Sequence, residues 1–366
     1  MQWFCHAVYV PEQAGPRSGM RGRLLTAGVP LGAAIVLGLG ASAAAEEPAM
    51  VAAADTAPST RCQITDPRLA ELSGLVVVGD QMLAVNDGGD QAAVHLLDAA
   101  CQVVDVHSAP VDPYDPEDLA LASDGTVWLA DTGDNNVNRP TVALLALRPD
   151  GTTGVHRLTY PDGPHDAEAL LLAPDGTPYL VTKEVLGASS VYRPASALVD
   201  GGTVALVKVA SVNITLTGTP GGPVGRAGQL LITGGAVSAD GSRLALRTYT
   251  DAYVWPLAGS DVVAALAAPP VRVALPESPQ GEAIGFTADN TALVVASEGL
   301  PSDLTVVPLP AGAGQAAAAA PAGGPVPSLA DLANSSSGLS AITAGIIAAC
   351  VATVVVWLGG LLRRRT

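Results

Sequence analysis

The sequence predicts an all-β fold built from a repeated unit, and two observations carry that prediction. A short phrase recurs five times, as ELSGLVVVGD, DPEDLALASDG, DAEALLLAPDG, ITGGAVSADG and QGEAIGFTADN. The last Asp of each phrase lies seven positions after a polar residue, pairing Ser73 with Asp80, Glu117 with Asp124, Glu168 with Asp175, Thr233 with Asp240 and Glu282 with Asp289. The phrases are 44, 51, 65 and 49 residues apart. Short strands repeated at such intervals are typical of a β-propeller.

Each unit of the repeat reads as a four-stranded blade. An apolar run leads to a tight turn, which is Asp-Gly in three of the units, and a second apolar run follows. These runs are the expected first and second strands. Third strands are expected at 93–97, 142–147, 190–192, 252–256 and 304–309, and fourth strands at 102–107, 154–160, 203–210 and 270–275.

The last unit has no fourth strand before the chain becomes rich in Ala, Gly and Pro at Ala311. Because a propeller must close its ring, the other terminus is expected to supply that strand, at Cys62–Ile64. Five blades fit the repeat directly. The long third interval has room for an inserted loop around 217–227 or for a degenerate sixth blade, so six blades remain the alternative.

Both ends of the chain predict export and anchoring. Arg21 and Arg23 precede an apolar run and a small-residue stretch, the order of a secretory signal peptide. Residues 341–362 carry no charge and precede three arginines, and a helix of that length spans about 33 Å, enough for a bilayer. The expected organisation is a leader and signal peptide (1–45), an Ala-rich linker (46–60), the propeller (61–310), an Ala/Gly/Pro-rich spacer (311–340), a single transmembrane helix (341–362) and a basic cytoplasmic tail (363–366). The propeller is therefore expected outside the cell membrane.

Charge and cysteine content restrict the partners and the compartment. Between the predicted leader and tail there are 12 basic and 33 acidic residues, a net charge of −21, which excludes nucleic acid as an expected partner. Cys62 and Cys101 are the only cysteines in the predicted exported part, so we expect a disulfide between them. Two buried thiols are the alternative, because sequence does not give their separation.

Polar residues from every blade are expected to meet at one face. The first residues of the innermost strands lie near the mouth of the central channel, and the second strands end at the same face. This predicts a binding face at the channel mouth that includes Ser73, Asn86, Asp87, Glu184, Thr233 and Glu298.

Carboxylates gathered at such a mouth repel one another, and a hard cation relieves the repulsion. The candidate metal ligands are Glu117, Glu168, Glu282, Asp131 and Asp134, and calcium is the candidate ion. The alternative is a structural network in which loop amides, Lys183 and Arg247 satisfy the carboxylates. The stretch from Asp131 to Asn136 likewise suits either a calcium loop or a turn capped by its own side chains.

Signals for catalysis are few. The chain has no G-x-S-x-G elbow around a serine, and the candidate catalytic residues are His165, Lys183 and Arg247. The hairpin aspartates fall on the opposite face, where a role in the turns accounts for them.

The phrases ELSGL, NDGGD, DPEDLA, ADTGDNN, DAEAL, LVTKE, ITGGAVSADG, LRTYTDAYVW and GEAI, in this order, resemble a group of secreted actinobacterial β-propeller proteins of uncharacterised function. More remotely, the chain resembles esterase-like phytase, NHL and gluconolactonase-type propellers. That resemblance implies the fold and a calcium site. A phytase activity is disfavoured, because the exported part has only two lysines, Lys183 and Lys208, to surround phosphate.

Two functions remain from the sequence. The first is a membrane-anchored module at the cell surface that binds a small ligand or an envelope protein. The alternative is a calcium-dependent hydrolase of the lactonase or phosphoesterase type.

Overall fold

The computed structural model describes residues 57–311 and 313, and within them the chain forms a β-propeller. The predicted leader, most of the linker and spacer, the transmembrane helix and the tail lie outside the described residues. Within the described residues no helix has both the length and the hydropathy to cross a bilayer.

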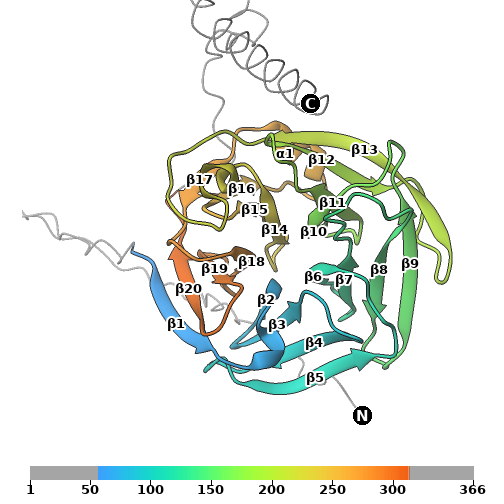
Figure 1. Cartoon of the computed structure of the whole chain (residues 1–366), viewed down its shortest axis with the longest axis horizontal. Helices are drawn as coiled ribbons and strands as arrows, with labels where there is room; N and C mark the ends of the chain where they lie inside the picture. Colours follow the sequence, from blue (N-terminus) through green and yellow to red (C-terminus); the bar gives the residue numbers. More distant parts are fainter. Residues whose placement is uncertain (1–56, 312, 314–366) are drawn as a thin grey trace, which may run out of the picture. The chain divides into compact units, whose positions relative to one another are not determined.

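Twenty strands form five blades of four strands around a centre, with the first strand of each blade innermost (Figure 1). Three blades are separate sheets, whereas blades 2 and 3 join into one eight-stranded sheet because their outermost strands, β9 and β13, pair in parallel. Blade 1 contains β2 (Leu72–Val78), β3 (Gln81–Asn86), β4 (Ala92–Leu97) and β5 (Val103–Ala109). Blade 2 contains β6 (Pro116–Leu121), β7 (Val127–Asp131), β8 (Val142–Leu147) and β9 (Thr153–Thr159). Blade 3 contains β10 (Ala167–Leu172), β11 (Pro178–Thr182), β12 (Ala188–Pro194) and β13 (Thr203–Asn213). Blade 4 contains β14 (Ile232–Val237), β15 (Arg243–Thr248), β16 (Asp251–Pro256) and β17 (Val271–Ala274), and blade 5 contains β18 (Gly281–Phe286), β19 (Ala292–Ser297), β20 (Ser302–Pro308) and β1 (Ser59–Ile64).

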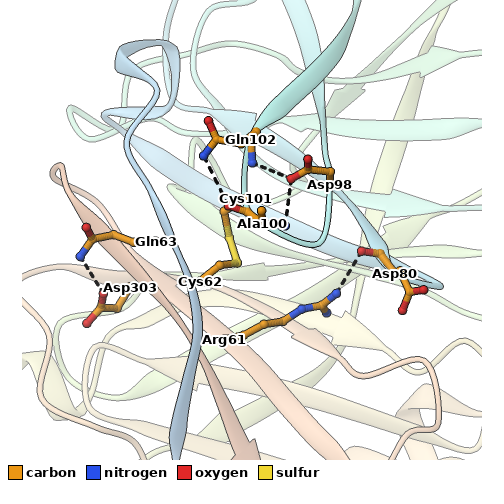
Figure 2. The surroundings of a disulfide bond; sticks show 9 residues. All are labelled: Arg61, Cys62, Gln63, Asp80, Asp98, Ala100, Cys101, Gln102 and Asp303. Carbon is orange, nitrogen blue, oxygen red and sulfur yellow. Dashed lines mark hydrogen bonds between the residues drawn. A yellow bond between two sulfur atoms is a disulfide. The ribbon is translucent and has the colours of Figure 1, made fainter.

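The ring closes as predicted, through a strand from the N-terminal side. β1 pairs antiparallel with β20, from Ser59 opposite Val306 to Ile64 opposite Ser302. The predicted disulfide is also confirmed: Cys62 of β1 is bonded to Cys101 in the turn between β4 and β5, with their Cα atoms 5.8 Å apart (Figure 2). It therefore joins the last blade covalently to the first.

The long third interval contains a loop and no further blade. Between β13 and β14 the described chain has one regular element, the 3₁₀ helix η2 (Gly225–Gln229). Gln229 holds this loop in place, because its side chain accepts from the amides of Thr217 and Gly218 and donates to the carbonyl of Thr219. The loop packs closely on Tyr249. A Cβ added at Gly222 of the loop would lie 2.8 Å from the Cβ of Tyr249.

Two smaller elements complete the fold. The 3₁₀ helix η1 (Pro67–Leu69) precedes blade 1, and the helix α1 (Val262–Ala267) connects β16 and β17. Asp261 caps α1 by accepting from the amide of Ala264, and Trp255 beneath the helix donates to the carbonyl of Ala268. Apolar side chains of neighbouring blades pack together, as Leu171, Val181, Ile232 and Leu246 do between blades 3 and 4.

Four of the five hairpin aspartates hold the tight turns between first and second strands, as predicted. Asp124 accepts from the amide two residues later, at Thr126, over 2.9 Å. The same bond recurs from Thr177 to Asp175, from Ser242 to Asp240 and from Thr291 to Asp289. We call this side of the propeller the hairpin face and the opposite side the loop face.

One carboxylate lies at the centre of the ring. Asp118 on β6 is almost completely buried and accepts from its neighbour Leu119, from Leu170 of β10 (2.8 Å) and from Gly235 of β14 (3.3 Å). Gly74 on β2 leaves room for it, since a Cβ at that position would lie 2.9 Å from Oδ1 of Asp118. Asp118 therefore ties three blades together and lies against a fourth, the adjacent blade 1.

Candidate functional site

A β-bulge lies near the start of the innermost strand in every blade. The strand register shifts between Leu72 and Gly74, Pro116 and Asp118, Ala167 and Ala169, Ile232 and Gly234, and Gly281 and Ile284. The skipped positions are those seven residues before the hairpin aspartates: Ser73, Glu117, Glu168, Thr233 and Glu282, with Ala283 also skipped in the last blade. A bulge turns a side chain out of the regular alternation, and all five of these residues are buried near the centre of the loop face.

The neutral residues among the five join adjacent blades. Ser73 donates to the carbonyl oxygen of Glu117 and, over 3.3 Å, to its carboxylate. Thr233 donates to the carbonyl of Gly281 over 2.9 Å. Blades 2 and 3 are joined in a similar way by Thr132, which donates to the carbonyl of Ala167.

The acidic residues form two groups that share Glu117. One group is Asp87, Asp115 and Glu117, and the other is Glu117, Asp166 and Glu168. Within each group, one carboxylate oxygen from every residue lies within 4.8 Å of those of the others. We call these five residues the acidic centre. Oxygen ligands at such separations suit a hard divalent cation such as Ca²⁺.

Sequence reasoning did not include Asp115 and Asp166 among the candidate ligands. Each lies two positions before a bulge glutamate, in the pattern Asp-x-Glu. That pattern occurs in blades 2 and 3 and was the available signal, but where a bulge shifts the alternation, spacing alone does not tell which side chains meet.

Gly133 leaves the space that the carboxylates occupy. A Cβ at this position would lie 2.1 Å from Oε1 of Glu117 and 2.5 Å from Oδ2 of Asp115. The amide of Gly133 donates to the carbonyl of Asp115 over 3.0 Å, which holds the two segments together. Only glycine fits this contact without displacing the acidic centre.

Glu168 has one satisfied and one unsatisfied carboxylate oxygen. Lys183 of the β11–β12 loop contacts Oε1 through its ammonium group and lies 5.6 Å from the ring centre of Tyr249. Oε2 of Glu168 is buried and has no hydrogen-bond partner among the described residues. A buried oxygen of this kind costs free energy unless a ligand or a proton satisfies it.

Burial and mutual repulsion raise the pKa values throughout the acidic centre. Desolvation raises the pKa of Glu168 to about 8 against the lowering effect of Lys183. Burial, a hydrogen bond with Asp115 and the charge of Asp115 raise the pKa of Asp87 to about 8. The pKa of Glu117 is raised by burial and by Glu168, and that of Asp166 by burial. Burial lowers the pKa of Lys183, but Glu168 and Tyr249 more than compensate, so the ammonium stays charged.

Glu282 and Glu298 form a neighbouring acidic pair outside both groups of the acidic centre. Gln280 donates to both carboxylates, with 3.3 Å between its Nε2 and Oε1 of Glu282. Burial and the hydrogen bond with Glu298 raise the pKa of Glu282 to about 8. Glu282 therefore pairs with Glu298 and belongs to neither group of candidate ligands.

Asp131 and Asp134 are satisfied by protein groups and lie outside the acidic centre. Asp131 forms an ion pair of 2.9 Å with Arg139 and accepts from the amide of Asp115. Asp134 accepts from the amide of Arg139 over 2.7 Å. The turn interpretation of this segment fits these contacts, and its contribution to the site is Gly133.

Arg247 is buried and unavailable to a ligand. Its guanidinium donates to the carbonyl oxygens of Ala283 and Ala296, over 2.7 and 3.0 Å. Desolvation lowers the pKa of Arg247 to about 10, with Glu282 opposing the shift. Arg247 therefore joins blades 4 and 5 from a buried position.

His165 belongs to an aromatic cluster next to the acidic centre. Its Nε2 lies 3.1 Å from Asp162 and 3.0 Å from the hydroxyl of Tyr192, and its Nδ1 lies 3.6 Å from Glu184. The ring of Tyr160 packs edge-on against both His165 and Tyr192.

Asn86, another residue of the predicted binding face, lies at the end of β3 in blade 1. Its side chain accepts from the amide of Glu71 and positions the loop that carries Asp87.

Most of the exposed large apolar side chains lie in loops of the loop face. Of the eight large apolar residues that are exposed in the described chain, six lie in loops of the loop face: Tyr114, Val137, Val185, Leu186, Leu216 and Val224. Arg139 stacks on the ring of Tyr114 at 4.3 Å. We call these six residues the apolar rim.

Comparisons with known proteins return similar structures only. No family model matches the chain, and no curated protein matches it. Solved structures that resemble it include a gluconolactonase from Xanthomonas campestris (17% identity, TM-score 0.39, 69% of this chain and 89% of that chain). Others are a putative gluconolactonase (15%, TM-score 0.38, 62% and 70%) and the PQQ-bound aldose sugar dehydrogenase from Streptomyces coelicolor (12%, TM-score 0.36, 68% and 97%).

Proposed function

We propose that this protein is a membrane-anchored, extracytoplasmic propeller that binds Ca²⁺ at the acidic centre and uses the ion to bind a ligand on its loop face. Asp87, Asp115, Glu117, Asp166 and Glu168 supply the oxygen ligands. The observation that carries the proposal is the buried, unpartnered Oε2 of Glu168 inside a group of carboxylates.

The balance of charge favours a cation over a purely structural network. Five carboxylates meet at the acidic centre, and Lys183 is the one basic side chain in contact with them among the described residues. In a structural network, loop amides and basic residues satisfy the acids, as Arg139 does for Asp131. In the acidic centre that compensation is partial: the amide of Asp134 donates to Asp166, and Lys183 contacts Glu168. One basic side chain does not balance five carboxylates, and a divalent ion provides the rest.

The ligand is expected to combine an anionic oxygen with an apolar part. An ion held by carboxylates from one side coordinates an oxygen of the ligand on the other. The apolar rim lies on the same face and supplies exposed hydrophobic side chains for contact with the ligand. A small acidic ligand or the acidic, apolar segment of an envelope protein meets both conditions.

The disulfide supports the location outside the cell. Structural disulfides persist in oxidising compartments, and Cys62–Cys101 joins the two ends of the ring. This agrees with the signal peptide and the anchor that the sequence predicts at 1–45 and 341–362.

A calcium-dependent hydrolase of the lactonase or phosphoesterase type is the second candidate. It is favoured by Lys183, whose ammonium stays charged beside the acidic centre and lies near the hydroxyl-bearing ring of Tyr249. A fixed cation in this position stabilises negative charge that develops on a substrate oxygen. Bound calcium would polarise that oxygen as a Lewis acid.

Metal analysis of the full-length protein in detergent, followed by a calcium titration of its thermal unfolding, tests the proposal. We expect a stoichiometric ion and a stabilisation of about 3 kcal/mol at calcium one hundred times above Kd. Glu168→Gln and Gly133→Ala should abolish the response, and Glu277→Gln, an exposed residue of the same face, should keep it. A wild-type protein without an ion and without a calcium response contradicts both candidates.

A second experiment distinguishes the enzyme from the binding module if calcium binds. The enzyme should hydrolyse lactone or phosphoester probes, and Lys183→Met should abolish that hydrolysis.

A further inference from the structure

The central channel has a second mouth, on the hairpin face, that forms a pocket of about 740 Å³. Its walls come from the innermost strands of all five blades, through Val76, Leu121, Leu172, Val237 and Phe286. A volume of this size is in the range of pockets that hold small organic ligands.

This pocket is separate from the acidic centre. Asp118 lies between them: Glu117, one residue earlier on β6, belongs to the acidic centre, and Leu119, one residue later, lines the pocket. The carboxylate of Asp118 bonds to the amides of Leu170 and Gly235 across the channel. The two mouths are therefore distinct sites with different chemistry.

The walls of the pocket are apolar and its charged lining is acidic. Asp124 and Asp240 line the pocket at the hairpin turns, and the lining residues include neither Lys nor Arg. The amide of Thr126 lowers the pKa of Asp124, and the hydrogen bonds from Ser238 and Ser242 outweigh the effect of burial and lower that of Asp240. Both carboxylates are consequently charged at neutral pH.

We propose that this pocket binds a small organic cation, with an apolar body between the innermost strands and an ammonium group at the mouth beside Asp124 or Asp240. The apolar walls favour burial of the body. The two carboxylates favour an ammonium over a neutral or anionic head group. The ligand class follows from this combination of volume, lining and charge.

The test compares three probes with the same apolar body: 4-phenylbutylamine, 4-phenylbutanol and 4-phenylbutyrate, titrated into the full-length protein and followed by saturation-transfer NMR. We expect the amine to bind best and the acid worst. Asp124→Asn with Asp240→Asn should weaken amine binding by about 3- to 10-fold, because the exposed charges contribute modestly, and leave the alcohol unaffected. Asn keeps the turn, and Asp289→Asn is the matched control, since Asp289 holds an equivalent turn but does not line the pocket.

Two further measurements separate this site from the acidic centre. Amine binding should persist in saturating calcium and in Gly133→Ala. Equal affinity for the three probes, or competition between the amine and calcium, overturns the proposal. Sedimentation provides one more contrary outcome. If the wild-type protein self-associates and Asp124→Asn with Asp240→Asn abolishes the association, a second copy of the chain covers the pocket and the proposal is overturned.

Discussion

The loop face and the hairpin face carry the same kind of side chain in opposite electrostatic states. At the hairpin face the amide of Thr126 lowers the pKa of Asp124, and the hydroxyl of Thr287 lowers that of Asp289. At the loop face burial raises the pKa values of Glu117 and Glu168. The turn carboxylates are paired with donors nearby in the sequence, whereas the buried ones face carboxylates from other blades.

The turn carboxylates serve the folding of each single blade, whereas the buried carboxylates form a site only when all the blades come together. Each turn needs an acceptor for its amides, so aspartate recurs from blade to blade. The bulge positions do not have to supply an acceptor for turn amides, so their residues differ between blades: Ser73, Glu117, Glu168, Thr233 and Glu282. The repeat stabilises the fold, and its departures from symmetry create the site.

The largest expected effect tests whether the two faces are independent. Replacing Cys62 and Cys101 with Ser opens a covalent loop with a sequence separation of 39 residues and should lower the free energy of unfolding by about 4 kcal/mol in the chain-entropy estimate. Denaturant titration of the full-length protein measures it, with reduced wild-type protein as the comparison. The calcium response should remain, because the disulfide lies at the outer edge of the ring; its loss would show that closure of the ring holds the acidic centre together.

The second prediction concerns pH. Without calcium, the folded protein keeps protons on Asp87, Glu168 and Glu282, whose pKa values of about 8 lie above those of the unfolded chain. The folded state then binds more protons than the unfolded state, so stability should fall as the pH rises from about 5 to about 8. Thermal unfolding across this range measures the fall.

Calcium should suppress that pH dependence, because the ion replaces the protons. The turn carboxylates, with lowered pKa values, predict the opposite trend: their contribution is lost as the pH falls below about 4. A calcium-free protein whose stability rises from pH 5 to pH 8 would contradict the account of the acidic centre.

The smallest effect contrasts one carboxylate from each face. Asp240→Asn should cost roughly 0.5 to 1 kcal/mol, because Asn keeps an acceptor for the turn but loses the charge. In calcium-free buffer above about pH 8, where Asp87 and Glu168 have lost their protons, Glu117→Gln should have the opposite sign and stabilise the protein by a similar amount, since it removes repulsion from these two carboxylates. Thermal unfolding with and without calcium checks both, and calcium should stabilise only the Asp240 variant. Destabilisation by Glu117→Gln in the absence of calcium would indicate a structural network.

The strands could be predicted from the sequence because each depends on local chemistry. The expected strand at 142–147 is β8 with the same bounds, and the expected closing strand at 62–64 extends to Ser59–Ile64 as β1. The residues of the site could be predicted only in part. Glu117 and Glu168 follow from the repeat, whereas Asp131 and Asp134 lie close in the sequence to Gly133 yet bond to Arg139.

By itself, the sequence determined the repeat, the turns, the closure of the ring and the face on which acidic residues collect, because periodicity and turn chemistry act within one blade. Only the tertiary structure decided which carboxylates meet. Asp87, Glu117 and Glu168 come from three different blades, and their distances depend on the bulges and on the space at Gly133. Burial, which raises their pKa values and leaves Oε2 of Glu168 without a partner, exists only when the blades have packed together.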